Sequence, residues 1–238
     1  GMIEYILALL QVKKGNHKKI PLLKNNICLL SYSLFLTALN YRRLTKKRKS
    51  SLFNDTEESR IFSFSMDIKN VNSIIQKKNC SFNGAIQSII FNYLYDFCQS
   101  YSVATVIGGE KTCYFNNHGA IPYRIDLNKN KENIPKNIDY LLNQNKFIVP
   151  VTLNKFISSF IKKKRNTIDI MFSGAPFSKE KLYLGESYVK KHEVFIPYHL
   201  VPMYVLSCKL EDKIHFSVGV KDIKLQKFLE KYNWEIIQ

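Results

Sequence analysis

The side chains best suited to acid–base chemistry in this 238-residue sequence are five histidines, no two of which are adjacent. They are His17, His118, His192, His199 and His215. The run Asn116-Asn117-His118-Gly119 predicts a turn, although an imidazole there could act as a general base. Tyr198 and His199 follow Pro197 on a predicted strand, where a histidine is more often packed or exposed than bound to a substrate.

Two further polar residues stand at the ends of predicted elements. Ser173 is followed by Gly174, Ala175 and Pro176, which end a strand abruptly and let the backbone approach a ligand closely. Asn83 stands at the start of a strongly apolar helix, where an asparagine commonly serves as N-cap. Each residue therefore has two interpretations. Ser173 is either a hydroxyl that is hydrogen-bonded at the strand end or a contact to a ligand. Asn83 is either the cap of its helix or a contact to a ligand.

The five cysteines (Cys28, Cys80, Cys98, Cys113 and Cys208) are scattered and form no Cys-x-x-Cys pair. This pattern favours reduced thiols over a zinc site or a disulfide framework. Cys98 and Cys208 fall on apolar patterns, so we interpret them as packed side chains rather than nucleophiles. No metal and no tightly bound cofactor is expected.

The formal net charge of +17 predicts attraction to anions such as nucleic acid, acidic proteins or phosphorylated cofactors. Much of the charge lies in short runs of basic residues, one of which is Lys162, Lys163, Lys164 and Arg165. The ordinary explanation of such a run is a solvated loop. The longest apolar stretches are too short to cross a bilayer and lack the features of a signal peptide. We therefore expect a soluble, cytoplasmic protein.

Apolar periodicity predicts helices and strands along the whole chain. Period-two alternation predicts strands at 60–66, 103–107, 112–115, 123–127 and 168–172, and a hairpin over 203–220 that turns at Glu211-Asp212-Lys213. Helices are predicted at 3–12, 25–41, 67–76, 81–97, 134–145 and 155–164, and a last one after Asp222. This order is typical of an α+β fold with helices packed on a mixed sheet. We expect N-terminal helices and a basic linker at 1–59, with 46–59 as the linker, and a lobe at 60–238.

Three passages together resemble the coenzyme A-dependent acyltransferase superfamily, which includes chloramphenicol acetyltransferase, condensation domains and wax ester synthases. Cys80-Ser-Phe-Asn83-Gly-Ala-Ile-Gln-Ser-Ile-Ile is similar to its "tvNdvllaa" helix. Phe172-Ser-Gly-Ala-Pro-Phe-Ser178 is similar to its "SNvpGP" strand end, and 202–222 resembles its closing hairpin. The resemblance runs from Arg60 to the C-terminus, and the shared order of degenerate motifs carries it.

The resemblance implies one half, the C-terminal one, of a two-lobed chloramphenicol acetyltransferase-like fold with a substrate tunnel between the lobes. Ser173 would then hydrogen-bond a developing oxyanion, and Asn83 would correspond to the family asparagine. Tyr198 and His199 would face the tunnel. Lys162–Arg165 would meet the phosphates of coenzyme A, whose thioester is the implied substrate, or an acidic carrier protein.

The sequence departs from the family in one decisive respect, because the family's catalytic His-His-x-x-x-Asp-Gly motif is absent. That histidine removes the proton of the attacking hydroxyl or amine. We therefore expect the chain to be inactive alone, with a missing N-terminal half as a possible partner and self-association into a homodimer as one way to cover an exposed tunnel wall. A non-catalytic module that binds acyl thioesters or carrier proteins is the first alternative. A basic nucleic-acid-binding protein is the second, and it depends on net charge alone because no nucleic-acid motif appears.

Overall fold

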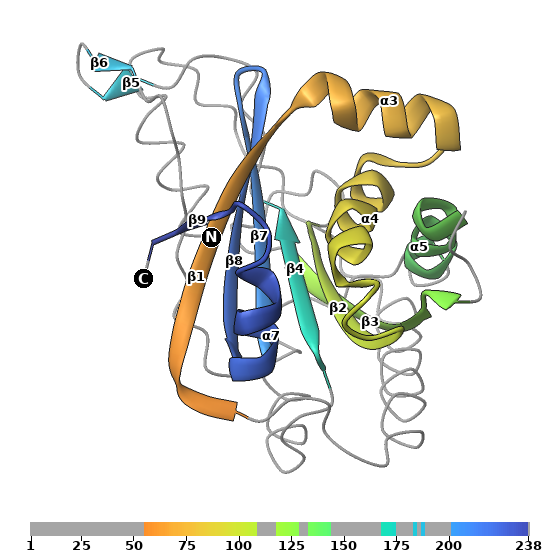
Figure 1. The fold of residues 1–238 in the computed structure, drawn as a ribbon. Coiled ribbons are helices and arrows are strands. Elements are labelled where there is room, and N and C mark those ends of the chain that lie inside the picture. The colour runs from red at the N-terminus through yellow and green to blue at the C-terminus, as the bar shows by residue number, and fades with distance from the viewer. Residues whose placement is uncertain are drawn as a thin grey trace, which may run out of the picture.

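The computed structural model describes residues 55–108, 118–128, 133–143, 168–174, 183–184, 187–188 and 201–237. Its strands are β1 (Asp55–Asp67), β2 (Ser100–Gly108), β3 (His118–Asp126), β4 (Ile170–Gly174), β5 (Tyr183–Leu184), β6 (Ser187–Tyr188), β7 (Met203–Leu210), β8 (Lys213–Asp222) and β9 (Glu235–Ile236). Its helices are α3 (Ile68–Lys78), α4 (Phe82–Leu94), α5 (Ile134–Asn143) and α7 (Ile223–Leu229), as Figure 1 shows.

Seven of these strands form one mixed sheet in the order β3-β2-β4-β7-β8-β1-β9, and β5 pairs separately with β6. The central strand β4 runs parallel to both of its neighbours, β2 and β7. The other neighbouring pairs of this sheet are antiparallel. The predicted α+β fold with a mixed sheet is confirmed.

The hairpin of β7 and β8 follows the predicted alternation. Ile214, Phe216 and Val218 are fully buried on one face of β8, and Glu211 makes the turn with a φ of 53°. Asp222 caps the following helix, as predicted, because its carboxylate accepts a hydrogen bond of 2.8 Å from the N–H of Leu225.

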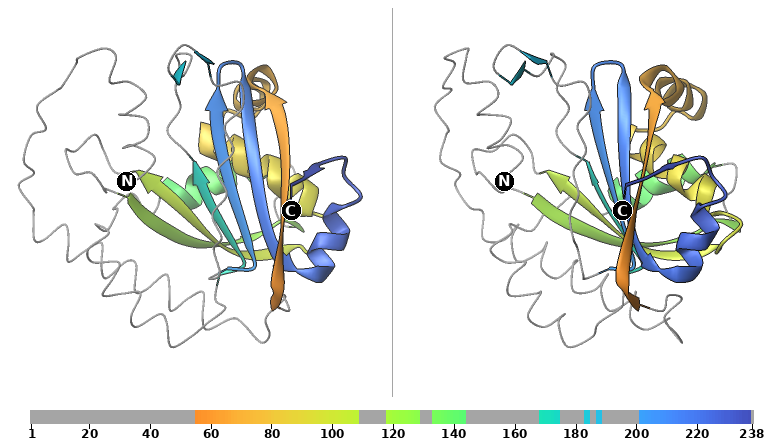
Figure 2. Two further views of the ribbon diagram at one scale, coloured as in Figure 1. Left: turned by 90° about the vertical axis from the view of Figure 1, so that its left-hand side faces the viewer. Right: turned by 60° about the vertical axis from the view of Figure 1, so that its left-hand side comes forward.

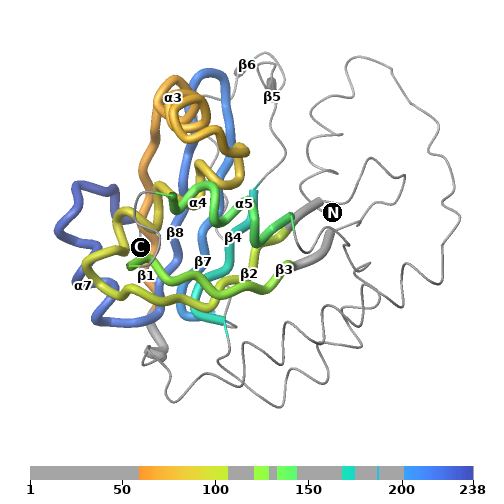
Figure 3. Tube along the Cα trace, turned by 90° about the vertical axis from the view of Figure 1, so that its right-hand side faces the viewer, coloured from red at the N-terminus to blue at the C-terminus, as the bar shows by residue number. Residues whose placement is uncertain are grey.

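Helices cover one side of the sheet (Figure 2). The stripe Ile86, Ile89, Ile90 and Leu94 of α4 is buried, as its i, i+3, i+4 spacing predicts. Apolar residues of α3, α4, α5 and α7 join the inward residues of six strands in one core cluster. Figure 3 shows α4 and α5 side by side over β2 and β3. No helix among the described residues is long and apolar enough to span a membrane.

The structure differs from the predicted elements at several places. Strand β3 begins at His118 rather than at residue 123, so His118 and Gly119 pair with β2 instead of forming the predicted turn. Strands β5, β6 and β9 were not predicted. Strand β1 begins at Asp55 rather than Arg60, so the last residues of the expected linker 46–59 belong to the sheet. Asp55 is paired with Asp222, with a register shift before Arg60, and this pairing depends on a distant strand rather than on local composition. Helix α4 ends at Leu94, so Phe97 packs on the core from the loop that follows the helix. The predicted elements at 3–12, 25–41, 112–115 and 155–164 lie outside the described residues.

Candidate functional site at the carboxyl end of β4

The carboxyl ends of three parallel strands meet where β4 ends. β4 stops at Gly174, whereas β7 continues to Leu210 and β2 to Gly108, past their partners on β4. Ligands bind preferentially outside the carboxyl ends of parallel strands in open sheets. The two residues that end β4, Ser173 and Gly174, are therefore the first candidates for contact with a ligand.

Ser173 faces away from the helices. The preceding residue, Phe172, contacts the ring of Phe91 on α4 with centroids 5.5 Å apart, and successive strand residues point to opposite faces. The register places Ser173 between Val106 of β2 and Leu206 of β7. Ser173 is half-buried, and its hydroxyl makes no hydrogen bond within the part of the chain that the structure describes. The structural interpretation given above, in which the Ser173 hydroxyl is hydrogen-bonded at the strand end, is thus not observed among the described residues.

Gly174 follows Ser173 on the strand, so a side chain at this position would point to the opposite, helix-covered side of the sheet. The residue is exposed. A Cβ at this position would lie 3.8 Å from the Oγ of Ser207, its register partner on β7. The last two residues of β4 therefore present different surroundings on the two faces of the sheet.

Asn83 lies in the first turn of α4 and is exposed. The interpretation of Asn83 as N-cap is wrong, because Ser81 caps the helix and accepts a hydrogen bond of 3.1 Å from the N–H of Gly84. The carboxylate of Asp139 on α5 accepts from both the N–H and the hydroxyl of Ser81, so a distant residue fixes the start of the helix. Because α4 packs on the side of Phe172, Asn83 and Ser173 lie on opposite sides of the sheet. A substrate-binding role for either residue remains a prediction.

The face that carries Ser173 also holds a buried imidazole, His215, to which the sequence analysis gave no specific role. Ser65 Oγ of β1 lies 2.7 Å from Nδ1 of His215 on β8, which is 7% exposed. His215 is two strands from Ser173 and two residues farther along, because its partner on β7 is Cys208 rather than Leu206, so the two backbones are about 12 Å apart. The period-two alternation of β8 could have predicted the face on which His215 lies, because its neighbours Ile214 and Phe216 both point inward.

Met171, Tyr204 and Leu206 make the same face apolar over β4 and β7, where Tyr204 and Leu206 form a second buried cluster with Val201. This apolar strip runs beside the free hydroxyl of Ser173. Tyr204 and Leu206 are 7% and 4% exposed, so most of this strip is buried, and the half-buried Ser173 is the polar residue next to it.

The described cysteines are free thiols at Cys80, Cys98 and Cys208. Burial raises the pKa of the Cys208 thiol from 9.0 to about 11, so it is neutral near pH 7 and a poor nucleophile. The thiol of Cys98 lies 3.5 Å from the carbonyl oxygen of Ser100. Neither arrangement is that of an activated catalytic cysteine.

A buried polar cluster lies under α4. The Oε1 atom of Gln87 accepts hydrogen bonds from the hydroxyls of Thr105, at 3.1 Å, and Tyr123. Burial raises the pKa of Tyr123, which keeps its hydroxyl protonated. The cluster joins α4 to β2 and β3 and stabilises the scaffold of the site.

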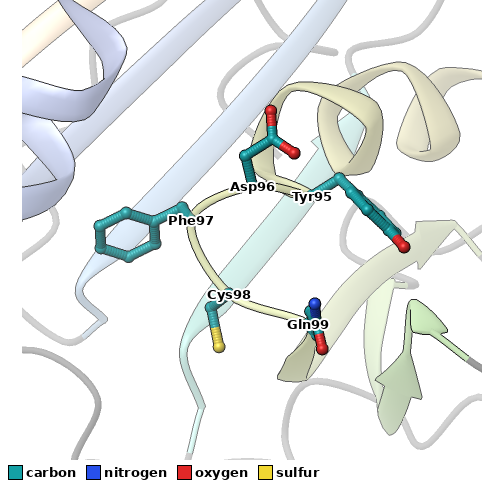
Figure 4. A pocket seen from close by; sticks show the side chains of 5 residues that line it. All are labelled: Tyr95, Asp96, Phe97, Cys98 and Gln99. Carbon is teal, nitrogen blue, oxygen red and sulfur yellow. The ribbon is translucent and has the colours of Figure 1, made fainter.

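A surface hollow lies over the loop between α4 and β2 (Figure 4). The residues that line it are consecutive: Tyr95, Asp96, Phe97, Cys98 and Gln99. Because they come from one loop and place no base beside a nucleophile, this hollow does not supply catalytic groups.

The remaining predicted site residues, Tyr198, His199 and the run Lys162, Lys163, Lys164 and Arg165, lie outside the described residues, and so does the side chain of His118. Among the described residues no group of three or more His, Cys, Asp or Glu side chains could hold a metal ion. Phe62, Phe91 and Phe216 are fully buried, so these aromatic rings belong to the core.

No protein-family model and no curated protein sequence matches this chain. Solved structures do match it. The epimerization domain from the third module of tyrocidine synthetase B has a TM-score of 0.59 and 12% identity over 95% of this chain and 60% of that one. Wax ester synthase/diacylglycerol acyltransferase from Marinobacter aquaeolei VT8 has a TM-score of 0.57 and 12% identity over 96% and 61%. Polyketide synthase associated protein 5 from Mycobacterium tuberculosis has a TM-score of 0.57 and 9% identity over 95% and 64%.

These similarities show that the chain has the fold of condensation-type domains and wax ester synthase. The resemblance stated from the sequence motifs is therefore confirmed at the level of the fold. The chain spans about 60% of the lengths of the tyrocidine synthetase domain and the wax ester synthase.

Proposed function

We propose that this chain forms the C-terminal lobe of an acyltransferase, which moves an acyl group from a coenzyme A or carrier-protein thioester to a hydroxyl or an amine. The observation that carries the proposal is the hydroxyl of Ser173. It stands at the carboxyl end of β4 without a hydrogen bond in the described part of the chain, beside the apolar strip of Met171, Tyr204 and Leu206.

The proposed role of Ser173 is to donate a hydrogen bond to the thioester carbonyl oxygen. Attack by the acceptor places negative charge on that oxygen, and a donor already in position stabilises it as it forms. Asn83, on the other side of the sheet, would contact the ligand beyond the end of β4.

Removal of the acceptor's proton needs a general base, and the family's adjacent histidine pair is absent from the sequence. We assign that step to a companion lobe that carries the histidine motif, and we expect little or no turnover by the 238-residue chain alone. The basic run Lys162–Arg165 is proposed to meet the phosphates of coenzyme A or of a phosphopantetheine-bearing carrier protein.

The absent histidine pair also favours a second candidate, a lobe that binds acyl thioesters without catalysis. Both candidates predict thioester binding through Ser173. They differ in whether a companion lobe with the histidine motif restores turnover.

The test is saturable binding of acetyl- and hexanoyl-coenzyme A to the purified chain, followed by calorimetry, with free-thiol release measured in parallel. Loss of one neutral hydrogen bond, about 0.5–1.5 kcal/mol, should weaken binding by the Ser173→Ala variant by roughly two- to tenfold. Ser102→Ala is the control, because Ser102 is on the same face of β2 but near the amino ends of the parallel strands.

Absence of binding would contradict both candidates. Turnover by the isolated chain that disappears in a His215→Ala variant would contradict the assignment of the base to a companion lobe.

A further inference from the structure

A small polar niche lies on the helix-covered side of the sheet where β4 ends. A Cβ on Gly174 would meet Ser207 Oγ at 3.8 Å and no other atom of the described residues within 4 Å. Gly174 is exposed, whereas Ser207 is 5% exposed. A buried hydroxyl therefore lies beside an exposed residue that has no side chain.

The hydroxyl of Ser207 makes no hydrogen bond within the described part of the chain. The residues that precede it on the same face of β7, Met203 and Val205, belong to the apolar core. Because Ser207 is buried beside these apolar residues, its hydroxyl loses its hydrogen bonds to water. It gains no hydrogen-bond partner in the described structure, which lowers the stability of the folded state. A ligand group that reaches the niche would satisfy this hydroxyl.

Helix α4 brings a second polar side chain to the same end of the sheet. Moving from Phe91 to Gln87 along α4 corresponds to moving from Tyr101 to Thr105 along β2, as their ring contact and hydrogen bond show. One further turn carries Asn83 toward β3 and α5, because Phe91 contacts Phe172 on β4 whereas Gln87 already bonds to Tyr123 on β3. Asn83 therefore lies at this end of the sheet but away from Gly174. Asn83, Gln87 and Phe91 are spaced four residues apart and share one side of the helix.

Gly174 and Ser207 carry no charge, so the niche suits a neutral group better than a phosphate or carboxylate. Because β4 stops at Gly174, a chain that passes its end can reach Ser173 on one face and Ser207 on the other. We infer that Ser207 and Gly174 form a specificity subsite that receives a hydroxyl group on the acyl chain. This inference rests on the proposed function and deepens it, since it names hydroxylated acyl thioesters as the favoured substrate class.

The experiment compares hexanoyl-coenzyme A with its 3-hydroxy and 6-hydroxy derivatives by calorimetry on the full 238-residue chain. At least one hydroxylated ligand should bind roughly three- to tenfold more tightly than hexanoyl-coenzyme A, the range expected for one neutral hydrogen bond. Ser207→Ala should bring that ratio to about one while leaving the affinity for hexanoyl-coenzyme A unchanged. Gly174→Ala should lower the ratio as well, because its methyl group would occupy the niche at an ordinary contact distance from Ser207 Oγ.

Ser102→Ala is the matched control, because Ser102 is also 5% exposed and its hydroxyl makes no hydrogen bond in the described structure. It should keep the wild-type ratio. Equal binding of all three ligands by the wild-type chain would overturn the subsite and leave the proposed function standing. A preference that persists in Ser207→Ala would overturn the assignment to Ser207, and absence of any binding would overturn the subsite together with the proposed function.

Discussion

The carboxylate of Asp139 accepts hydrogen bonds from both the backbone N–H and the side-chain hydroxyl of Ser81. This contact fastens α5 to the first residues of α4. The two helices come so close that a Cβ on Gly84 would lie 2.6 Å from the side-chain atom Asp139 Oδ1 and 2.7 Å from the backbone carbonyl oxygen of Pro135. Asn83 precedes Gly84 directly, so the same contact positions the candidate binding residue of α4.

Gly84→Ala should destabilise the protein, although alanine normally stabilises a helix relative to glycine. The added methyl group would have to separate α4 from α5, at a cost of roughly 1–3 kcal/mol in the free energy of unfolding. Urea denaturation measures this. Gly219→Ala is the control, because a Cβ there meets no atom of the described residues within 4 Å, and it should change stability by less than about 0.5 kcal/mol. Equal effects of the two substitutions would contradict the close approach at Gly84.

Asn79 ends α3 in the left-handed region, with φ 45° and ψ 61°, and its N–H donates to the carbonyl oxygen of Ile75. Asn79→Ala should lower the free energy of unfolding by about 1 kcal/mol, because a Cβ disfavours this backbone conformation and asparagine tolerates it. Asn79→Gly should be neutral or stabilising. Chemical denaturation of the two variants tests the sign, and a more stable alanine variant would show that the helix does not end in this way.

Gln87 accepts two hydrogen bonds inside the core, from Thr105 and Tyr123. Tyr123→Phe removes one donor and leaves Gln87 its bond to Thr105, so it should cost about 1 kcal/mol of stability. Gln87→Leu leaves two buried hydroxyls without their acceptor and should cost more, roughly 2–4 kcal/mol. Thermal and urea unfolding of the single and double variants measure the coupling. Strictly additive costs would mean that the three side chains do not act as one cluster.

Burial raises the pKa of the Cys208 thiol from 9.0 to about 11. The folded state therefore holds this proton more strongly than the unfolded state, so the associated stability is present below pH 9 and is lost as the pH rises toward 11. The difference in unfolding free energy between wild type and Cys208→Ala should be constant from pH 7 to 8.5 and should shift against the wild type above pH 9. Urea titrations at several pH values, in a reducing buffer, measure it. A difference that does not vary with pH would place Cys208 in a more hydrated position.

Local sequence determined the elements and many of their ends. Period-two alternation determined the β7–β8 hairpin, the i, i+3, i+4 stripe determined the inward side of α4, and Asp222 determined where α7 begins. These features depend on residues a few positions apart, so the printed order of amino acids contains them.

Tertiary structure alone decided the site. The sequence marked Ser173 and Gly174 as a strand end, but it could not show that β4 lies between β2 and β7, which places Ser207 beside Gly174. It also suggested Asn83 as the cap of α4, whereas Ser81 is the cap and is held by Asp139 from another helix. Strand order, and the contacts between distant segments that follow from it, come from burial of the whole apolar surface at once. Local periodicity carries no record of which distant segment becomes a neighbour.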